Sequence, residues 1–123
     1  MRPGRPDSYG SSAMSDGADW TTYLVEHYWP GVTEAAFHRS ARLVAASAER
    51  LARAGEPIRF LHSTLVPDDE AAFCVLAAAT PDLVGRAYAE AGVTFERLVV
   101  AIESEVHPGW VDAAQQPLAE NRR

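Results

Sequence analysis

The chain has 123 residues, 47% of them hydrophobic and 23% charged, a length that favours one domain whose core folds without disulfides. Its 11 basic and 17 acidic residues give a net charge of −6, which argues against a protein that binds nucleic acid through phosphate contacts. The single cysteine, Cys74, excludes an internal disulfide and favours a reducing, cytoplasmic compartment. No apolar run approaches the roughly 20 residues of a membrane-spanning helix, and the N-terminus lacks the pattern of a secretory signal.

Composition divides the chain into three parts. Residues 1–19 are rich in Gly, Ser, Pro and Asp and show no apolar periodicity, which predicts a disordered leader. Residues 20–105 carry the periodic apolar patterns of a folded domain. Residues 106–123 are interrupted by prolines and a glycine and are expected to form a flexible C-terminal tail.

The first half of the domain predicts a strand, a helix and a second strand. Trp20–Tyr28 is dense in aromatic and β-branched side chains, as is typical of a strand, and a Pro-Gly pair follows it. Thr33 is a favourable N-cap, and Gly55 is a favourable C-terminal residue for a helix. Between them, apolar residues recur every three or four positions and form one stripe: Phe37, Ala41, Val44, Ala48 and Leu51. Ile58–Val66 is the second predicted strand.

The second half predicts a strand, a helix and a final strand. Residues 67–69, Pro-Asp-Asp, are a turn signal, and Ala71–Ala78 is apolar enough for a central strand. Thr80, followed by a proline, begins a second helix, which ends at Gly92. Phe95–Ser104 alternates between polar and apolar residues, which predicts a fourth strand. The apolar positions of that strand are Leu98, Val100 and Ile102.

The resulting order, β-α-β-β-α-β, predicts the ferredoxin-like fold, an α+β fold with two helices on one face of an antiparallel sheet. Tyr23 and Val25 lie on one side of the first strand, whereas Leu24 and Tyr28 lie on the other. Both faces of the sheet are therefore partly apolar, and the face without helices would be a large exposed patch in a monomer. We expect a homodimer, sheet to sheet or edge to edge, such as a dimeric α/β barrel.

Candidate functional residues are few. The nucleophile elbow, the Gly-rich phosphate loop and the HExxH zinc motif are absent from the sequence. Imidazole, thiolate and carboxylate groups suit nickel, zinc or copper, and a divalent metal ion is a candidate partner. The candidate metal ligands are His27, His62, Cys74, Asp68, Asp69 and Glu70. If the domain is an enzyme instead, polar strand residues are its acid–base candidates: Glu26, His62, Arg97 and Glu103.

The register of the central hairpin decides whether two of these candidates meet. If the strands pair directly from the turn, Ser63 lies opposite Cys74, and His62 points to the other face. A one-residue bulge in the turn would instead place Thr64 opposite Cys74 and bring His62 to the same face. Periodicity alone does not choose between the two registers.

Three segments, in order, carry a family resemblance: YLVEHYWPGVT (Tyr23–Thr33), GEPIRFLHSTLVPDDEAAFCVLAA (Gly55–Ala78) and AGVTFERLVVAIE (Ala91–Glu103). They resemble a family of small bacterial ferredoxin-like domains, long classed as a domain of unknown function, in which one member is described as a nickel-binding protein. The resemblance covers the whole predicted domain. It implies a dimer of ferredoxin-like protomers that holds nickel at surface sites and takes part in nickel sequestration or tolerance.

Three functions are compatible with these residues. We favour a homodimeric metal-binding protein without turnover, with nickel as the metal that the resemblance implies. The alternative is a small-molecule enzyme of the dimeric α/β barrel class, such as a monooxygenase, isomerase or cyclase, and a closed cavity containing one of the acid–base candidates would favour it. The third is an interaction module that has neither a cavity nor a metal.

Overall fold

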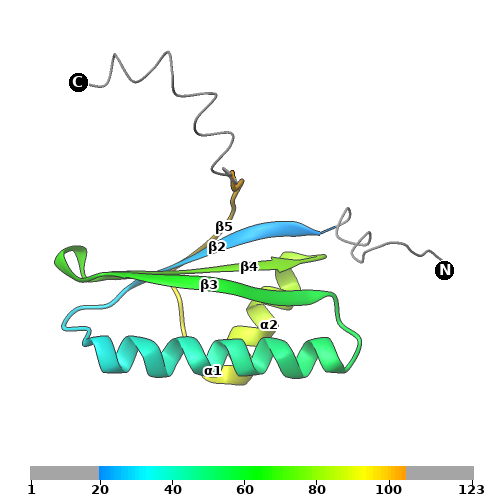
Figure 1. The fold of residues 1–123 in the computed structure, drawn as a ribbon, viewed down its shortest axis with the longest axis horizontal. Helices are drawn as coiled ribbons and strands as arrows, with labels where there is room; N and C mark the ends of the chain where they lie inside the picture. The colour runs from blue at the N-terminus through cyan, green and yellow to red at the C-terminus, as the bar shows by residue number, and fades with distance from the viewer. Residues whose placement is uncertain (1–19, 105–123) are drawn as a thin grey trace, which may run out of the picture.

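The computed structural model describes residues 20–104, so the predicted leader and tail both lie outside the described residues. The elements follow the predicted order (Figure 1): β2 (Thr21–Tyr28), α1 (Glu34–Arg53), β3 (Ile58–Val66), the short 3₁₀ helix η2 (Pro67–Asp69), β4 (Ala71–Ala78), α2 (Pro81–Ala91) and β5 (Arg97–Val100). The bounds of the two helices and of β3 and β4 agree with the sequence prediction to within about one residue at each end.

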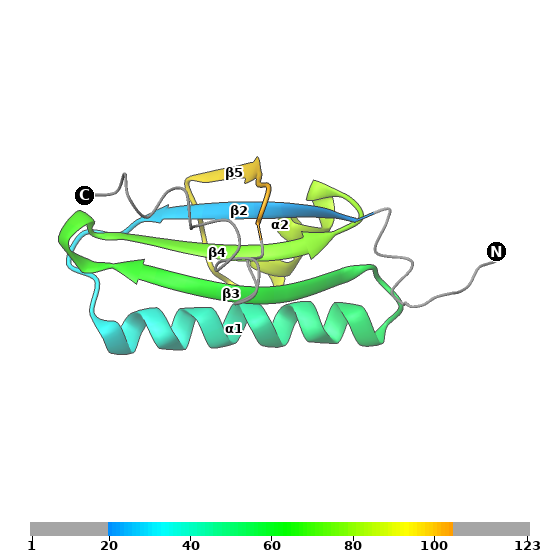
Figure 2. The same ribbon diagram turned by 45° about the horizontal axis from the view of Figure 1, so that its top comes forward.

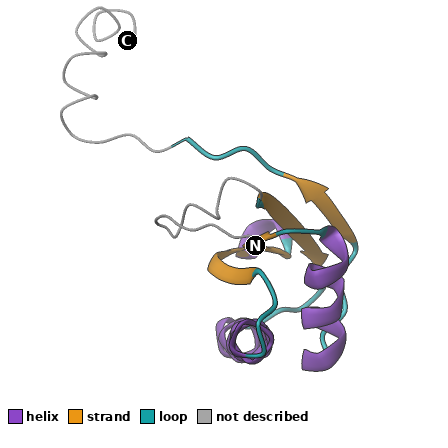
Figure 3. Cartoon of the chain, turned by 90° about the vertical axis from the view of Figure 1, so that its right-hand side faces the viewer, coloured by secondary structure: helices purple, strands orange, loops and turns teal. Residues whose placement is uncertain are grey.

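The four strands form one antiparallel sheet in the order β3-β4-β2-β5. Both helices lie on the same face of this sheet (Figure 3). The architecture is therefore α+β and compatible with the predicted ferredoxin-like fold. The opposite face of the sheet carries no helix, and it is called the open face below.

Local signals explain where the helices begin and end. The Thr33 hydroxyl accepts a hydrogen bond from the Ala36 backbone N–H at 3.0 Å, which caps the first turn of α1. Gly92, with φ of 73°, ends α2 in the left-handed region that glycine adopts without strain. No helix within residues 20–104 is long and apolar enough to cross a membrane.

The core lies between the sheet and the two helices. The predicted stripe of α1 is buried there, except that Ala41 is only partly buried. The pattern did not reveal Ser47, which is 0% exposed and donates a hydrogen bond of 2.7 Å to the Ala87 carbonyl of α2. A buried hydroxyl needs such a partner, and here the bond joins the two helices.

The fourth strand is shorter than predicted, because β5 covers only Arg97–Val100 of the expected Phe95–Ser104. Two of the apolar positions of the predicted strand, Val100 and Ile102, are 64% and 95% exposed, and Ile102 lies beyond the end of β5. The Ala101 N–H still donates to the Thr22 carbonyl at 2.9 Å, after which the chain leaves the edge of the sheet. Alternation in the sequence continues beyond the strand, but strand pairing does not.

Candidate functional site

The hairpin register places His62 and Cys74 on opposite faces of the sheet. β3 and β4 pair directly from the turn, with Ser63 opposite Cys74 and His62 opposite Val75. The register shift lies at Leu61 rather than in the turn. The first of the two predicted registers is therefore the observed one, and His62 with Cys74 forms no ligand cluster.

On the open face, His62 meets Glu103. The distance from His62 Nε2 to Glu103 Oε2 is 3.7 Å, and both side chains are about half exposed. His62 lies on β3 at one edge of the sheet, whereas Glu103 follows β5 at the other edge. The Glu103 side chain therefore reaches over the open face towards β3, and residues 101–104 are called the crossing segment. In Figure 2 this segment passes in front of β2, whereas in Figure 1 it rises away from the sheet.

The open face is not uniformly exposed. Val75, at the centre of the face on β4, is only 4% exposed. Other apolar groups remain accessible, because Tyr28 at the end of β2 is 60% exposed and Ile102 of the crossing segment is almost fully exposed. The open face therefore combines a buried centre with exposed apolar side chains.

Glu26 and Arg97, two of the predicted acid–base residues, form a bidentate pair between neighbouring strands. Arg97 Nε and Nη2 donate to the two carboxylate oxygens of Glu26 at 3.1 Å each. These hydrogen bonds hold the pKa of Glu26 below its usual value and raise the pKa of Arg97. Both groups therefore remain charged and paired, a state that suits cross-strand stabilisation better than proton transfer.

His27 lies at the end of β2 on the face that the helices cover, and it is 8% exposed. Its Nε2 is 3.2 Å from the Tyr88 hydroxyl, and the ring also forms a hydrogen bond with the Thr94 backbone. Burial lowers the pKa of His27, and the nearby Glu96 charge and the Thr94 bond act in the opposite direction. The imidazole is thus neutral near pH 7 and already hydrogen-bonded within the protein.

Cys74 shares the Tyr88 hydroxyl with His27. The thiol is 4% exposed and forms a hydrogen bond with Tyr88, and burial raises the pKa of Cys74. Burial also raises the pKa of Tyr88 strongly. Because metals bind the thiolate, a buried thiol with a raised pKa is a poor ligand. Tyr88 lies in the core on α2, and its hydroxyl partners depend on the sheet register, which periodicity does not reveal.

In the acidic turn after β3, one residue is hydrogen-bonded to another segment and two are exposed. Glu70 accepts a hydrogen bond from the Gly31 N–H through Oε2 at 3.0 Å, and its carbonyl accepts one from the Trp29 N–H at 2.7 Å. Glu70 therefore joins the turn to the segment after β2, whereas Asp68 and Asp69 are exposed. Across residues 20–104, no three His, Cys, Asp or Glu side chains form a group that could hold a metal ion.

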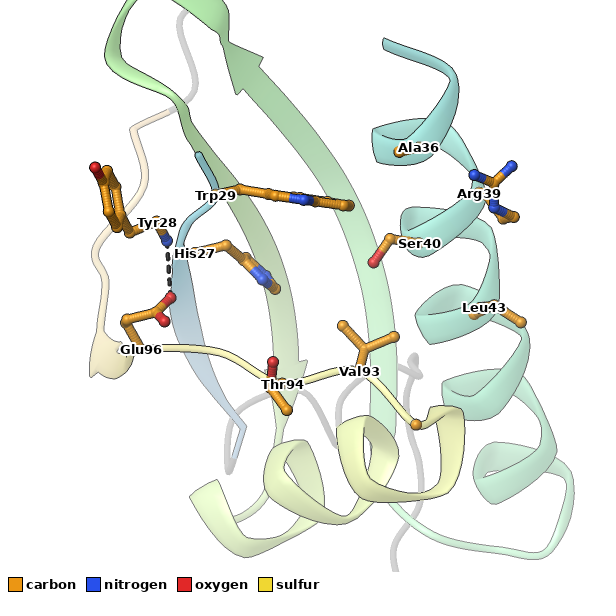
Figure 4. A pocket seen from close by; sticks show the side chains of 11 residues that line it. His27, Tyr28, Trp29, Ala36, Arg39, Ser40, Leu43, Val93, Thr94 and Glu96 are labelled. Carbon is orange, nitrogen blue, oxygen red and sulfur yellow. Dashed lines mark hydrogen bonds between the residues drawn. The ribbon is translucent and has the colours of Figure 1, made fainter. Parts of the chain in front are cut away.

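A cavity of about 320 Å³ opens at one end of the helix-covered face (Figure 4). It lies between the end of β2, the first half of α1 and the loop that connects α2 to β5. His27, Trp29, Ser40 and Val93 point into the space between these segments. None of the predicted acid–base residues lines this cavity.

Comparisons with known proteins identify relatives of the domain. Residues 23–100 match the model of a family described as "Nickel responsive protein SCO4226-like". A solved structure, described as "Crystal structure analysis of SCO4226 from Streptomyces coelicolor A3(2)", is similar with a TM-score of 0.58 and 16% sequence identity, over 68% of this chain and 99% of that chain. At this identity, the structural likeness shows the fold alone. No curated protein matches the chain.

Proposed function

Because the chain belongs to the SCO4226-like family of nickel responsive proteins, we propose that it binds Ni²⁺ without turnover and serves in nickel sequestration or tolerance. The observation that carries the proposal is the pairing of His62 with Glu103 on the open face. An imidazole nitrogen and a carboxylate oxygen are both suitable donors for this ion.

The distance between the two donor atoms fits a shared ion. His62 Nε2 and Glu103 Oε2 are 3.7 Å apart, which is less than two metal–ligand bonds of roughly 2.1 Å placed end to end. One ion can therefore contact both atoms with only small side-chain rotations. The two side chains are also about half exposed, so an ion can reach them from solvent. Water or groups from a second copy would fill the remaining positions.

The other predicted ligands are less suitable. His27 and Cys74 are buried and hydrogen-bonded to Tyr88, and Glu70 is bonded to the Gly31 backbone. Asp68 and Asp69 are accessible, but no histidine accompanies them in a group of three ligands among residues 20–104. His62 and Glu103 are accessible and combine both donor types, and they join β3 to the segment after β5.

We also propose that the protein is a homodimer in which the open faces of two copies meet. Tyr28 and Ile102 are large apolar side chains on this side of the sheet that remain exposed. Burying them against a second copy is favourable. Such an arrangement would bring two His62–Glu103 pairs to one interface.

Isothermal titration calorimetry with NiCl₂ tests the metal proposal on tag-free full-length protein. His62→Ala and Glu103→Ala should each weaken nickel binding at least about tenfold, because each removes one protein ligand. His38→Ala and Glu34→Ala are matched controls, since that exposed pair has a similar distance of 3.9 Å on α1. Absence of nickel binding to the wild type, or a loss confined to the α1 variants, would contradict the proposal.

Light scattering after size exclusion tests the dimer. Phe73 of β4 lies beside Glu26 on the open face, so Phe73→Glu places a charge there and should produce a monomer. Leu43→Glu is the control, because Leu43 is 48% exposed on α1, away from that face. A wild-type monomer at micromolar concentration would exclude the dimer and leave the single-copy nickel site to be judged by calorimetry.

The enzyme alternative lacks comparable support. It requires a cavity containing at least one of the acid–base candidates. The cavity beside α1 contains none of them, because all four side chains lie on or across the open face. We therefore favour the metal-binding function.

A further inference from the structure

We infer that the cavity between α1, the end of β2 and the loop after α2 binds a small organic carboxylate with an aromatic or branched apolar body. This site is separate from the proposed nickel site, because it lies on the helix-covered side of the sheet and shares neither His62 nor Glu103. The inference therefore does not depend on nickel binding or on the dimer.

The size and walls of the cavity suit a small molecule. Its volume of about 320 Å³ is at the lower end of the roughly 300–1,000 Å³ that is usual for small-molecule sites. The Trp29 and His27 rings face Val93 and α1 across the space (Figure 4). Leu43 also lines it and is 48% exposed, so a bound molecule would cover apolar surface that now faces water.

The cavity has two kinds of polar group: one that is fixed by hydrogen bonds within the protein, and one that is free to bind a ligand. His27 is fixed by Tyr88 and the Thr94 backbone, so it forms a neutral, pre-organised wall. The Ser40 hydroxyl points towards the cavity and forms no side-chain hydrogen bond with residues 20–104. Behind it, a void of about 10 Å³ reaches Cys74 and is comparable in size to one water. A polar substituent of the ligand, or a water that bridges the ligand and the protein, can therefore occupy the inner end of the cavity.

The rim of the cavity carries one group that can bind an anion. Arg39 of α1 lines the cavity, is exposed and forms no salt bridge within the described part of the chain. Glu96, on the opposite rim, already accepts a hydrogen bond from the Tyr28 N–H at 2.8 Å. Glu96 keeps its negative charge, so the rim carries one charge of each sign, and the guanidinium of Arg39 is the group there that can bind a carboxylate. A ligand with an apolar body would contact the apolar walls of the cavity, and its carboxylate would pair with Arg39.

Benzoate and benzamide test this inference, because they share a ring and differ in charge. In ¹H–¹⁵N NMR spectra of the full-length protein, benzoate should shift the amide signals of Ser40, Leu43 and Thr94. Arg39→Gln should weaken benzoate binding by about two- to fivefold, which is the size expected for an exposed ion pair, and should leave benzamide binding unchanged. Arg42→Gln is the matched control, because Arg42 is also exposed on α1 but does not line the cavity.

A second pair of variants tests the location. Ala36→Phe adds a ring on the α1 side of the cavity and should abolish benzoate binding, whereas Ala46→Phe, at an exposed α1 position outside the cavity, should not. Thermal melts of both variants confirm folding, and His62→Ala should bind benzoate as the wild type does. The inference is overturned if millimolar benzoate shifts none of these signals, if benzamide binds equally well, or if Ala36→Phe still binds benzoate.

Discussion

Replacing Tyr88 with phenylalanine removes one hydroxyl from the centre of the domain and retains the ring. Tyr88 is 1% exposed, and its hydroxyl is the partner of both His27 Nε2 and the Cys74 thiol. The ring packs edge-on against Phe95 at a centroid distance of 5.1 Å, and this contact should persist in the variant. The change therefore isolates the hydrogen bonds from the packing.

The expected loss of folding free energy follows from the buried polar atom that loses its hydrogen bond to the Tyr88 hydroxyl. A buried acceptor that loses its hydrogen bond costs about 1–3 kcal/mol, so Tyr88→Phe should destabilise the domain by about 2 kcal/mol. For a domain of this size, that corresponds to a fall in Tm of about 8–16 °C, measured by circular dichroism at pH 7.5. Tyr28→Phe is the control, because Tyr28 is 60% exposed and water solvates its hydroxyl. If the Tm of Tyr88→Phe lies within about 2 °C of the wild type, the reasoning about this buried cluster is refuted.

Three further changes test other parts of the fold. Lowering the pH from about 7.5 to 5.5 should reduce the free energy of unfolding, because His27 binds a proton near pH 6.5 in the unfolded chain, whereas burial keeps its pKa lower in the folded state. Urea titrations should show a smaller loss of stability for His27→Gln than for the wild type. An equal loss would contradict the assignment to His27. Ser47→Ala removes the 2.7 Å bond to Ala87 and should cost about 1 kcal/mol in chemical denaturation; an unchanged midpoint would show that this bond does not hold the helices together. Thr33→Ala removes the N-cap bond to Ala36 and should also cost about 1 kcal/mol, with faster amide exchange in the first turn of α1 as the local readout.

The order of the elements could be predicted because its signals are local. Threonine caps and glycines in the left-handed region mark the ends of both helices, and periodicity marks the buried faces between them. The end of β5 could not be predicted in this way. Whether an edge strand continues depends on contacts with distant residues, and here Glu103 pairs with His62 across the sheet instead of extending the strand.

The sequence predicted the residue types of the candidate site but not their arrangement. His62, Cys74 and Glu103 are visible as functional residue types, but the hairpin register separates the first two and the crossing segment brings the first and last together. The role of Tyr88 was hidden, because its hydroxyl partners come from two different strands. The cavity beside α1 arises from a loop and two elements, an arrangement that periodicity does not describe.

The position of bound nickel tests the central claim most directly. Paramagnetic Ni²⁺ broadens the NMR signals of nearby nuclei, so titration of ¹⁵N-labelled protein maps the ion without any mutation. We expect broadening centred on His62 and Glu103, extending to Val75 on the neighbouring strand. Broadening centred on His38 or on the turn at Asp68 and Asp69, with the open face unaffected, would contradict the account.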